Sequence, residues 1–227
     1  MKKSRQRSTR NNALLVYLLA MAGMGAMLFL PAGTLDYWEA WAFLAILFIP
    51  MVVWLRYLLK RDPELLERRI RFREKEKREK ALMRLGKLMF FASFLVPGLD
   101  RRFGWSGVPP WLVIAADSVI LLSYAAIFLV FRENTYASRI VEVEKGQKVI
   151  RTGPYAVVRH PMYAATITMY LCFPIALGSY VGLIFWAPFF ALILARISDE
   201  EDVLQRRLKG YRGYMKEVRY RLIPRVW

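Results

Sequence analysis

The 227-residue sequence is poor in the residues that build disulfides, metal sites and soluble nucleotide-binding domains. Cys172 is its one cysteine, so no disulfide can form within the chain, and with His160 as the one histidine no Cys/His spacing predicts a metal site. No Gly-x-Gly-x-x-Gly loop follows a strand-like stretch, which excludes a soluble Rossmann-type methyltransferase. We expect Cys172 to pack in apolar surroundings.

Acidic residues are also scarce, with 18 Asp and Glu against 35 Lys and Arg and a net charge of +17. Nucleic-acid binding is one interpretation of such a balance. However, apolar runs of about 18 to 20 residues separate the basic segments, and each is long enough to cross a bilayer core of about 30 Å. With 56% hydrophobic residues, the sequence predicts an all-α, polytopic membrane helical bundle whose basic face rests on anionic lipid. No nucleic-acid partner is expected.

The apolar runs predict about six membrane spans (five to six), the first of them an uncleaved span rather than a signal peptide. They cover residues 13–30, 40–59, 88–105, 109–131, 162–177 and 180–197. The third is interrupted by Pro97-Gly98 and ends at Asp100, Arg101 and Arg102, whose side chains we expect to snorkel to the interface. Whether it crosses fully stays open. The last two runs are separated only by Gly178-Ser179, which predicts an antiparallel hairpin.

Two charged segments lie outside these runs. Lys60–Lys87 carries alternating charges that can pair along a solvated or interfacial helix, with a substrate-docking surface as the alternative. The segment after Arg196 has an apolar periodicity of three and four residues, which predicts an amphipathic tail helix lying in the interface or folded back over the central loop. Its apolar positions are Val203, Leu204, Leu208, Tyr211, Met215, Val218 and Leu222, and Gly210 and Gly213 make a break possible.

All lysines and arginines except Arg101 and Arg102 fall on segments that six spans place on one side of the membrane. The positive-inside rule therefore predicts that both termini, the central loop and the tail are cytoplasmic. The same arrangement brings the loop around His160 and the segment from Arg196 to Glu200 to one surface, where we expect a polar pocket beside an apolar wall. Asp117 lies within the fourth span, so it must be paired or face a cavity, and we favour a structural role for it.

The central loop has the features of a helix start. Gly153-Pro154 predicts a turn, and Pro161 suits the first position of a helix, which places His160 at the N-cap. A helix N-terminus is a seat for a carboxylate or phosphate. Simpler interpretations remain open: His160 as a structural cap, Arg196 as a snorkelling anchor, Glu200 as its ion-pair partner, and the nearby tyrosines as interfacial residues.

Four motifs in this half carry a resemblance to a known family. They are Gly153-Pro154-Tyr155, Arg159-His160-Pro161-x-Tyr163, Arg196-x-x-x-Glu200-Glu201-x-x-Leu204 and Tyr211-x-x-Tyr214. Together they resemble the C-terminal half of the isoprenylcysteine carboxyl methyltransferases, which are membrane enzymes related to phospholipid methyltransferases. The resemblance divides the chain into membrane spans on the probable lipid-substrate side (1–131) and a methyltransferase-like catalytic region (132–227).

This resemblance implies an S-adenosylmethionine-dependent O-methyltransferase that acts on the carboxylate of an isoprenylcysteine-like or other lipidic substrate. It assigns substrate orientation to Arg196, with Glu200 for the cofactor ammonium and His160 for its carboxylate. The cofactor-binding residues that it implies are Gln147, Lys148, Val149, Ile150, Tyr155, His160, Pro161, Met162, Tyr163 and Glu200. The charged segment 133–145 cannot be aligned with the family.

Three other functions remain open. Phospholipid amine N-methylation is the nearest, but it needs a deprotonated amine and gains nothing from Arg196. A membrane reductase resembles the same region but requires NADPH, and the short tail offers no extra motif for that larger cofactor. A non-catalytic lipid-binding scaffold predicts that the polar cluster is dispensable. The acceptor, the host membrane and the oligomeric state are left open.

Overall fold

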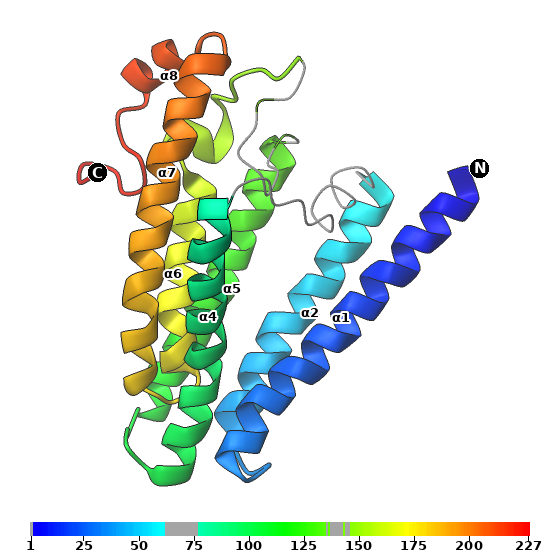
Figure 1. Ribbon diagram of the computed structural model, residues 1–227, viewed down its shortest axis with the longest axis vertical. Helices are drawn as coiled ribbons and strands as arrows, with labels where there is room; N and C mark the ends of the chain where they lie inside the picture. The colour runs from blue at the N-terminus through cyan, green and yellow to red at the C-terminus, as the bar shows by residue number, and fades with distance from the viewer. Residues whose placement is uncertain (1, 62–76, 135, 137–142, 144–145) are drawn as a thin grey trace.

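The computed structural model describes residues 2–61, 77–134, 136, 143 and 146–227. In these residues the chain is helical and contains no strand, so the prediction of an all-α bundle is confirmed (Figure 1). The elements in chain order are α1 (Lys2–Ala32), α2 (Trp38–Arg61), α4 (Lys77–Phe103), α5 (Pro110–Glu133), η1 (Gly153–Ala156), α6 (Pro161–Ala176), η2 (Val181–Trp186), α7 (Ala187–Arg207) and α8 (Tyr211–Glu217).

Four stretches within the described residues are long and apolar enough to cross a membrane: Leu14–Ala32, Trp38–Tyr57, Pro110–Glu133 and Val181–Arg207. The apolar helix α6 is shorter, and α4 is not among the four. A bundle with several such helices is a multi-pass membrane protein. Of the charged segment Lys60–Lys87, residues 62–76 lie outside the described part, as does most of 133–145.

The helices α4 and α1 pack closely because Gly98 has no side chain. A Cβ atom at this position would lie 2.5 Å from the carbonyl oxygen of Leu28, so any larger residue would push the two helices apart. Gly98 follows Pro97, which lies inside α4 without ending it. The Pro97-Gly98 pair expected to interrupt this run therefore sits at a helix crossing.

The predicted hairpin is present as α6, a turn at Gly178 and Ser179, and then η2 and α7. Its two arms contact each other through side chains, for example Tyr170 and Phe189, whose ring centroids are 5.1 Å apart. The second arm begins with a short 3-10 helix rather than an α-helix. Trp186 ends this 3-10 helix and is buried in an aromatic core with Phe94 and Phe173, which joins the hairpin to α4. Cys172 packs against the same core, as expected.

The expectation that Asp100 reaches the interface by snorkelling is wrong. Its side chain is 2% exposed and accepts hydrogen bonds from the Ser106 backbone N–H (2.7 Å), the Ser106 hydroxyl (2.6 Å) and the Ser179 hydroxyl (2.5 Å). These donors come from the α4–α5 connection and from the hairpin turn. Asp100 is therefore a junction that closes the end of the bundle drawn at the bottom of Figure 1.

Asp117 is buried in α5, and its Oδ1 atom has no hydrogen-bond partner among the described residues. The expected pairing is not seen there, and the structural interpretation of this residue stays a prediction.

The break that was considered possible at Gly210 is present, and the tail helix is shorter than its apolar periodicity predicts. Helix α7 ends at Arg207, and the chain resumes as α8 only at Tyr211, because Gly210 adopts φ +89°, a left-handed conformation that breaks an α-helix. Val218 and Leu222 lie outside α8. The break lets α8 fold back, and Tyr211 and Tyr214 pack with Val149 of the central loop in a separate apolar cluster.

Candidate functional site

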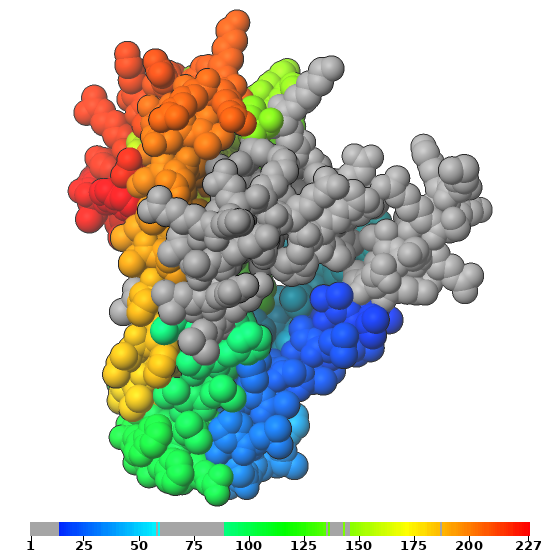
Figure 2. All heavy atoms as spheres, viewed as in Figure 1, coloured from blue at the N-terminus to red at the C-terminus, as the bar shows by residue number. Residues whose placement is uncertain are grey.

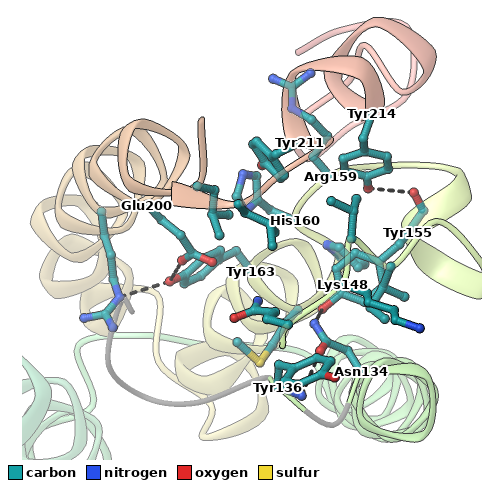
Figure 3. A pocket seen from close by; sticks show the side chains of 18 residues that line it. Asn134, Tyr136, Lys148, Tyr155, Arg159, His160, Tyr163, Glu200, Tyr211 and Tyr214 are labelled. Atoms are coloured by element: carbon teal, nitrogen blue, oxygen red, sulfur yellow. Dashed lines mark hydrogen bonds between the residues drawn. The ribbon is translucent and has the colours of Figure 1, made fainter. Parts of the chain in front are cut away.

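A pocket lies where the central loop, α5, α6, α7 and α8 meet, at the upper end of the bundle in Figure 1, and Figure 3 shows it from close by. It is partly enclosed and partly open to solvent. Its lining is formed by Asn134, Tyr136, Gln147, Lys148, Val149, Ile150, Tyr155, Arg159, His160, Pro161, Met162, Tyr163, Arg196, Glu200, Leu204, Leu208, Tyr211 and Tyr214.

This lining contains all eleven residues that the sequence singled out as site residues. The hairpin returns Arg196 and Glu200 of α7 to the start of α6, where His160, Pro161, Met162 and Tyr163 lie. The central loop supplies the remaining five, Gln147 to Ile150 and Tyr155. The juxtaposition expected from the sequence is therefore present, while the role of each residue toward a ligand stays a prediction.

One wall of the pocket holds a chain of three polar side chains. Arg196 donates from Nε to the Tyr163 hydroxyl at 3.0 Å, and this hydroxyl donates to Glu200 Oε2 at 2.7 Å (Figure 3). The interpretation of Arg196 and Glu200 as a direct ion pair is therefore replaced by a link through Tyr163. The hydroxyl holds a cation and a carboxylate at fixed positions on the same wall.

The most deeply buried charge beside the pocket is Glu201, whose side chain is 1% exposed. Its Oε1 accepts a hydrogen bond from Arg159 Nε (2.7 Å) and lies 3.1 Å from His160 Nε2. Its Oε2 accepts a hydrogen bond from Arg221 Nε at 2.9 Å and forms an ion pair with Arg221 Nη2 at 2.9 Å. A buried carboxylate is costly unless it is paired and fully hydrogen-bonded, and these donors meet that requirement.

His160 occupies the N-cap position of α6 as predicted, but its side chain makes no capping hydrogen bond. Its Nε2 atom faces Glu201 instead. An ionised carboxylate only accepts hydrogen bonds, so the proton is assigned to Nε2. The backbone N–H groups in the first turn of α6 are thus left without a side-chain cap, and such groups favour an anion.

The segment after α8, residues 218–221, holds the start of α6 in place. The backbone N–H groups of Arg159 and His160 donate to the carbonyl oxygens of Tyr220 and Arg221, each at 2.9 Å. Arg159 also donates from Nη1 to the carbonyl oxygens of Val218 (3.0 Å) and Arg219 (2.6 Å). Because Arg159 and Arg221 share Glu201, residues 218–221 are bound to both the loop and α7.

The opposite wall is built on tyrosines. Asn134 at the end of α5 donates from Nδ2 to the Tyr155 hydroxyl at 2.8 Å, and the Tyr214 hydroxyl donates to the Tyr155 carbonyl oxygen at 2.7 Å (Figure 3). Burial raises the pKa of both Tyr211 and Tyr214 above the usual tyrosine value, so both stay protonated at neutral pH. Arg151 fastens the loop to α8 through Glu217, with an Nη1–Oε1 distance of 2.5 Å.

The pocket lining offers polar groups of different kinds to a ligand. The Tyr211 hydroxyl lines it, is buried, and has no hydrogen-bond partner among the described residues. Glu200 provides an anion for an ammonium group, and the uncapped start of α6 provides a seat for a carboxylate. No group of His, Cys, Asp and Glu in the described part of the chain could hold a metal ion.

Sequence reasoning missed part of this site. Glu201 and Arg159 stood within the quoted motifs, but neither was given a role, and nothing in the sequence pointed to Arg221. Asn134 and Tyr136 lie within the segment 133–145 that could not be aligned. The signal for Glu201 was its place one residue after Glu200 at the end of a span, where a carboxylate buried on the bundle side needs cationic partners.

Comparison with known proteins finds a family match that covers the pocket lining except Tyr211 and Tyr214. A model of the phospholipid methyltransferase family matches residues 111–209, which run from α5 through the end of α7. The Delta(14)-sterol reductase TM7SF2 of Mus musculus is 29% identical over 105 residues, which are 43% of this chain and 25% of the reductase. The protein named Uncharacterized protein YpbQ of Bacillus subtilis (strain 168) is 30% identical over 124 residues, 52% of this chain and 69% of YpbQ.

The two relatives differ in how much of them the chain spans. It covers only a quarter of the length of the sterol reductase, so that likeness concerns one region of a longer protein. It covers more than two thirds of YpbQ. The phospholipid methyltransferases belong to the same membrane methyltransferase superfamily as the isoprenylcysteine carboxyl methyltransferases. On its match to YpbQ, the chain belongs to the same family as YpbQ, and its residues 111–209 match the phospholipid methyltransferase family.

Proposed function

We propose that the protein is an integral-membrane S-adenosylmethionine-dependent methyltransferase that methylates a carboxylate on a lipidic, isoprenylcysteine-like substrate. The observation that carries this proposal is the chain from Arg196 through Tyr163 to Glu200 on one pocket wall. It presents a cation for an acceptor carboxylate and an anion for the cofactor ammonium, a short distance apart. A scaffold that only binds lipid has no need of this arrangement.

The residues around the start of α6 would hold the cofactor. Glu200 pairs with its ammonium group, and the uncapped N-terminus of α6 beside His160 receives its carboxylate. Tyr155 and the backbone of Val149 and Ile150 flank the adenosine. When bound, S-adenosylmethionine supplies a sulfonium methyl group, an electrophile for a carboxylate oxygen.

The residues of the chain then need to position the acceptor and exclude water. A carboxylate is ionised at neutral pH, so no general base is required. Arg196 can hold it through its guanidinium while Nε stays on Tyr163. Such positioning can supply on the order of 7 to 11 kcal/mol of a reaction barrier.

An apolar wall beside the pocket supports a lipidic acceptor. Met162 lines the pocket and packs against Phe131 of α5, which in turn contacts Trp54 of α2 with ring centroids 4.3 Å apart. A lipid chain entering between α2 and α5 would lie against these side chains, with its carboxylate directed toward Arg196.

The second candidate is N-methylation of a phospholipid amine, and the match to the phospholipid methyltransferase family favours it. This reaction needs a neutral amine, so Arg196 on the pocket wall opposes it. A reductase is the third candidate because of the likeness to the sterol reductase.

We place the pocket on the cytoplasmic side. The support is the excess of lysine and arginine on the segments at this end, together with Figure 1, in which the N-terminal end of α1 and α8 both lie in the upper half.

Calorimetry of the detergent-purified protein with S-adenosylhomocysteine and, separately, with NADPH tests the cofactor. We expect binding of S-adenosylhomocysteine alone; binding of NADPH alone would establish the reductase instead, and binding of neither would leave the scaffold. Transfer of labelled methyl groups to a prenylcysteine analogue and to phosphatidylethanolamine then tests the acceptor. Labelling of phosphatidylethanolamine alone would overturn the carboxylate assignment.

A further inference from the structure

Residues 218–227, here called the tail segment, expose apolar side chains although they are bound firmly to the protein. Ile223 is 55% exposed, Val226 74% and Trp227 38%. A soluble surface normally keeps such side chains scattered, whereas a cluster within five residues marks a contact site. The same segment carries Arg219, Arg221 and Arg225 and no acidic residue.

The backbone holds these apolar side chains in a fixed turn. The Val226 N–H donates to the Ile223 carbonyl oxygen at 3.1 Å, with Pro224 and Arg225 as the central residues. Arg225 has φ +65°, a conformation that usually requires glycine or asparagine at the third position of such a turn.

The tail segment lies at the height where α7 leaves the apolar layer. In α7 the apolar run ends at Ile197, with Arg196 as the one charged residue before that point, and polar residues follow from Ser198. Glu201 is therefore about 6 Å farther along at 1.5 Å per residue. Arg221 is bound to Glu201. From there the segment runs down beside α7 in Figure 1 and lies on its outer side in Figure 2. This height corresponds to the headgroup layer, which is roughly 5 to 8 Å thick.

The charge of this surface selects the kind of lipid. Arg219 and Arg225 of the tail segment are exposed, and Arg206 and Arg207 are exposed at the end of α7. The tail segment itself contains no Asp or Glu; within it Arg221 is paired with Glu201, and Glu217, just before it, is paired with Arg151. Basic residues beside a membrane-embedded helix are attracted to anionic phospholipid headgroups, and exposed aromatic and aliphatic side chains next to them suit the headgroup–acyl boundary.

We propose that the tail segment docks on an anionic bilayer surface, with Ile223, Val226 and Trp227 at the headgroup–acyl boundary and Arg219 and Arg225 on lipid phosphates. The remainder of the segment is hydrogen-bonded to Arg159 and His160. Lipid contact therefore stabilises residues 218–221, which hold the start of α6. The proposal depends on the membrane fold and not on the reaction carried out in the pocket.

A spin label reports the depth of this contact directly. The full-length Cys172→Ala protein carrying Val226→Cys is labelled with a nitroxide and placed in nanodiscs of phosphatidylcholine with phosphatidylglycerol. We expect power saturation to show greater accessibility to oxygen than to a water-soluble nickel chelate. Lys216→Cys on α8 is the matched control, since Lys216 is exposed on the element that covers the pocket, and we expect the reverse ratio there.

Equal ratios at the two positions would overturn the proposal, because the tail segment would then lie in water. Shielding of the Val226→Cys label from both reagents would overturn it in favour of a protein partner, a second copy included. In nanodiscs of phosphatidylcholine alone we expect a shallower label, and an unchanged depth there would contradict the preference for anionic lipid. If the labelled Val226→Cys protein fails to fold, as judged by gel filtration, Ile223→Cys replaces it.

Discussion

Two carboxylates, Asp100 and Glu201, are buried near opposite ends of the bundle, and they are satisfied in different ways. Asp100 accepts from one backbone N–H and two serine hydroxyls, all of them neutral groups. Glu201 faces two arginines and His160. Both side chains are almost fully buried, so burial alone does not distinguish a structural junction from a site residue.

The two sets of donors differ in how they respond when the carboxylate is replaced by an amide. A serine hydroxyl both donates and accepts, so it can reverse its hydrogen bond, whereas a guanidinium only donates. The Asp100 junction therefore tolerates an amide, and the Glu201 junction does not. Cationic partners also keep a charged network next to the pocket, while neutral partners only close the end of the bundle. We therefore expect substitutions at Asp100 to lower stability without changing ligand affinity, and substitutions at Glu201 to lower both.

Glu201→Gln should have the largest effect. Whether the amide nitrogen replaces Oε1 or Oε2, it would face an N–H donor of Arg159 or Arg221. The buried Arg159 would also lose its counter-charge. Breaking a buried pair in this way costs about 3 to 5 kcal/mol of folding free energy. We expect a large fall in thermal stability and a loss of S-adenosylhomocysteine affinity of at least about 10-fold, measured by calorimetry on the folded fraction. Unchanged affinity would show that the network does not support the pocket.

Arg196→Lys comes next, and it changes the pocket wall without touching the buried network. A lysine has one nitrogen and cannot bind Tyr163 and an acceptor carboxylate in a fork. We expect turnover to fall by about 100-fold, equivalent to about 3 kcal/mol, with S-adenosylhomocysteine affinity nearly intact. Kinetics with labelled methyl donor and calorimetry measure the two quantities. Equal loss of both would remove the orienting role of Arg196.

Asp100→Ala and Asp100→Asn test the opposite end. Alanine leaves the Ser106 N–H and two hydroxyls without their acceptor, which costs about 1 to 3 kcal/mol, while asparagine keeps one acceptor and donates to a serine oxygen. We expect a clear drop in thermal stability for alanine and a small one for asparagine. Cofactor affinity should not change in either variant. A weaker affinity in Asp100→Asn would contradict the separation of the two ends.

The sequence was most informative where a periodic pattern or a fixed joint determined geometry. The apolar runs predicted the helices, and the short joint at Gly178 and Ser179 brought Arg196 and Glu200 to His160, because two arms of similar length must end near each other. Charge was harder to interpret. Asp100 next to two arginines looked like a snorkelling end, because nothing in its own neighbourhood reveals that Ser179 returns to it from 79 residues away.

The tail shows a second limit of sequence reasoning. Its apolar residues keep a helical spacing from Val203 to Leu222, yet the positive φ of Gly210 ends that periodicity in space. Residues 218–221 contribute only carbonyl oxygens to their hydrogen bonds with Arg159 and His160, so these bonds leave no trace in the side chains of the segment. For that reason Arg221 could not be assigned to the Glu201 network beforehand.

Glu217→Gln should have the smallest effect, and it sharpens the comparison by testing a charge outside both junctions. Glu217 binds Arg151 between α8 and the central loop, but the two side chains are 55% and 44% exposed. Water and salt screen such a pair, and exposed pairs contribute about 0 to 1 kcal/mol. We expect thermal stability and S-adenosylhomocysteine affinity close to those of the unmodified protein, within about two-fold for affinity. A loss as large as that of Glu201→Gln would show that α8 is held over the pocket by this surface pair, and the buried carboxylate would no longer be its main support.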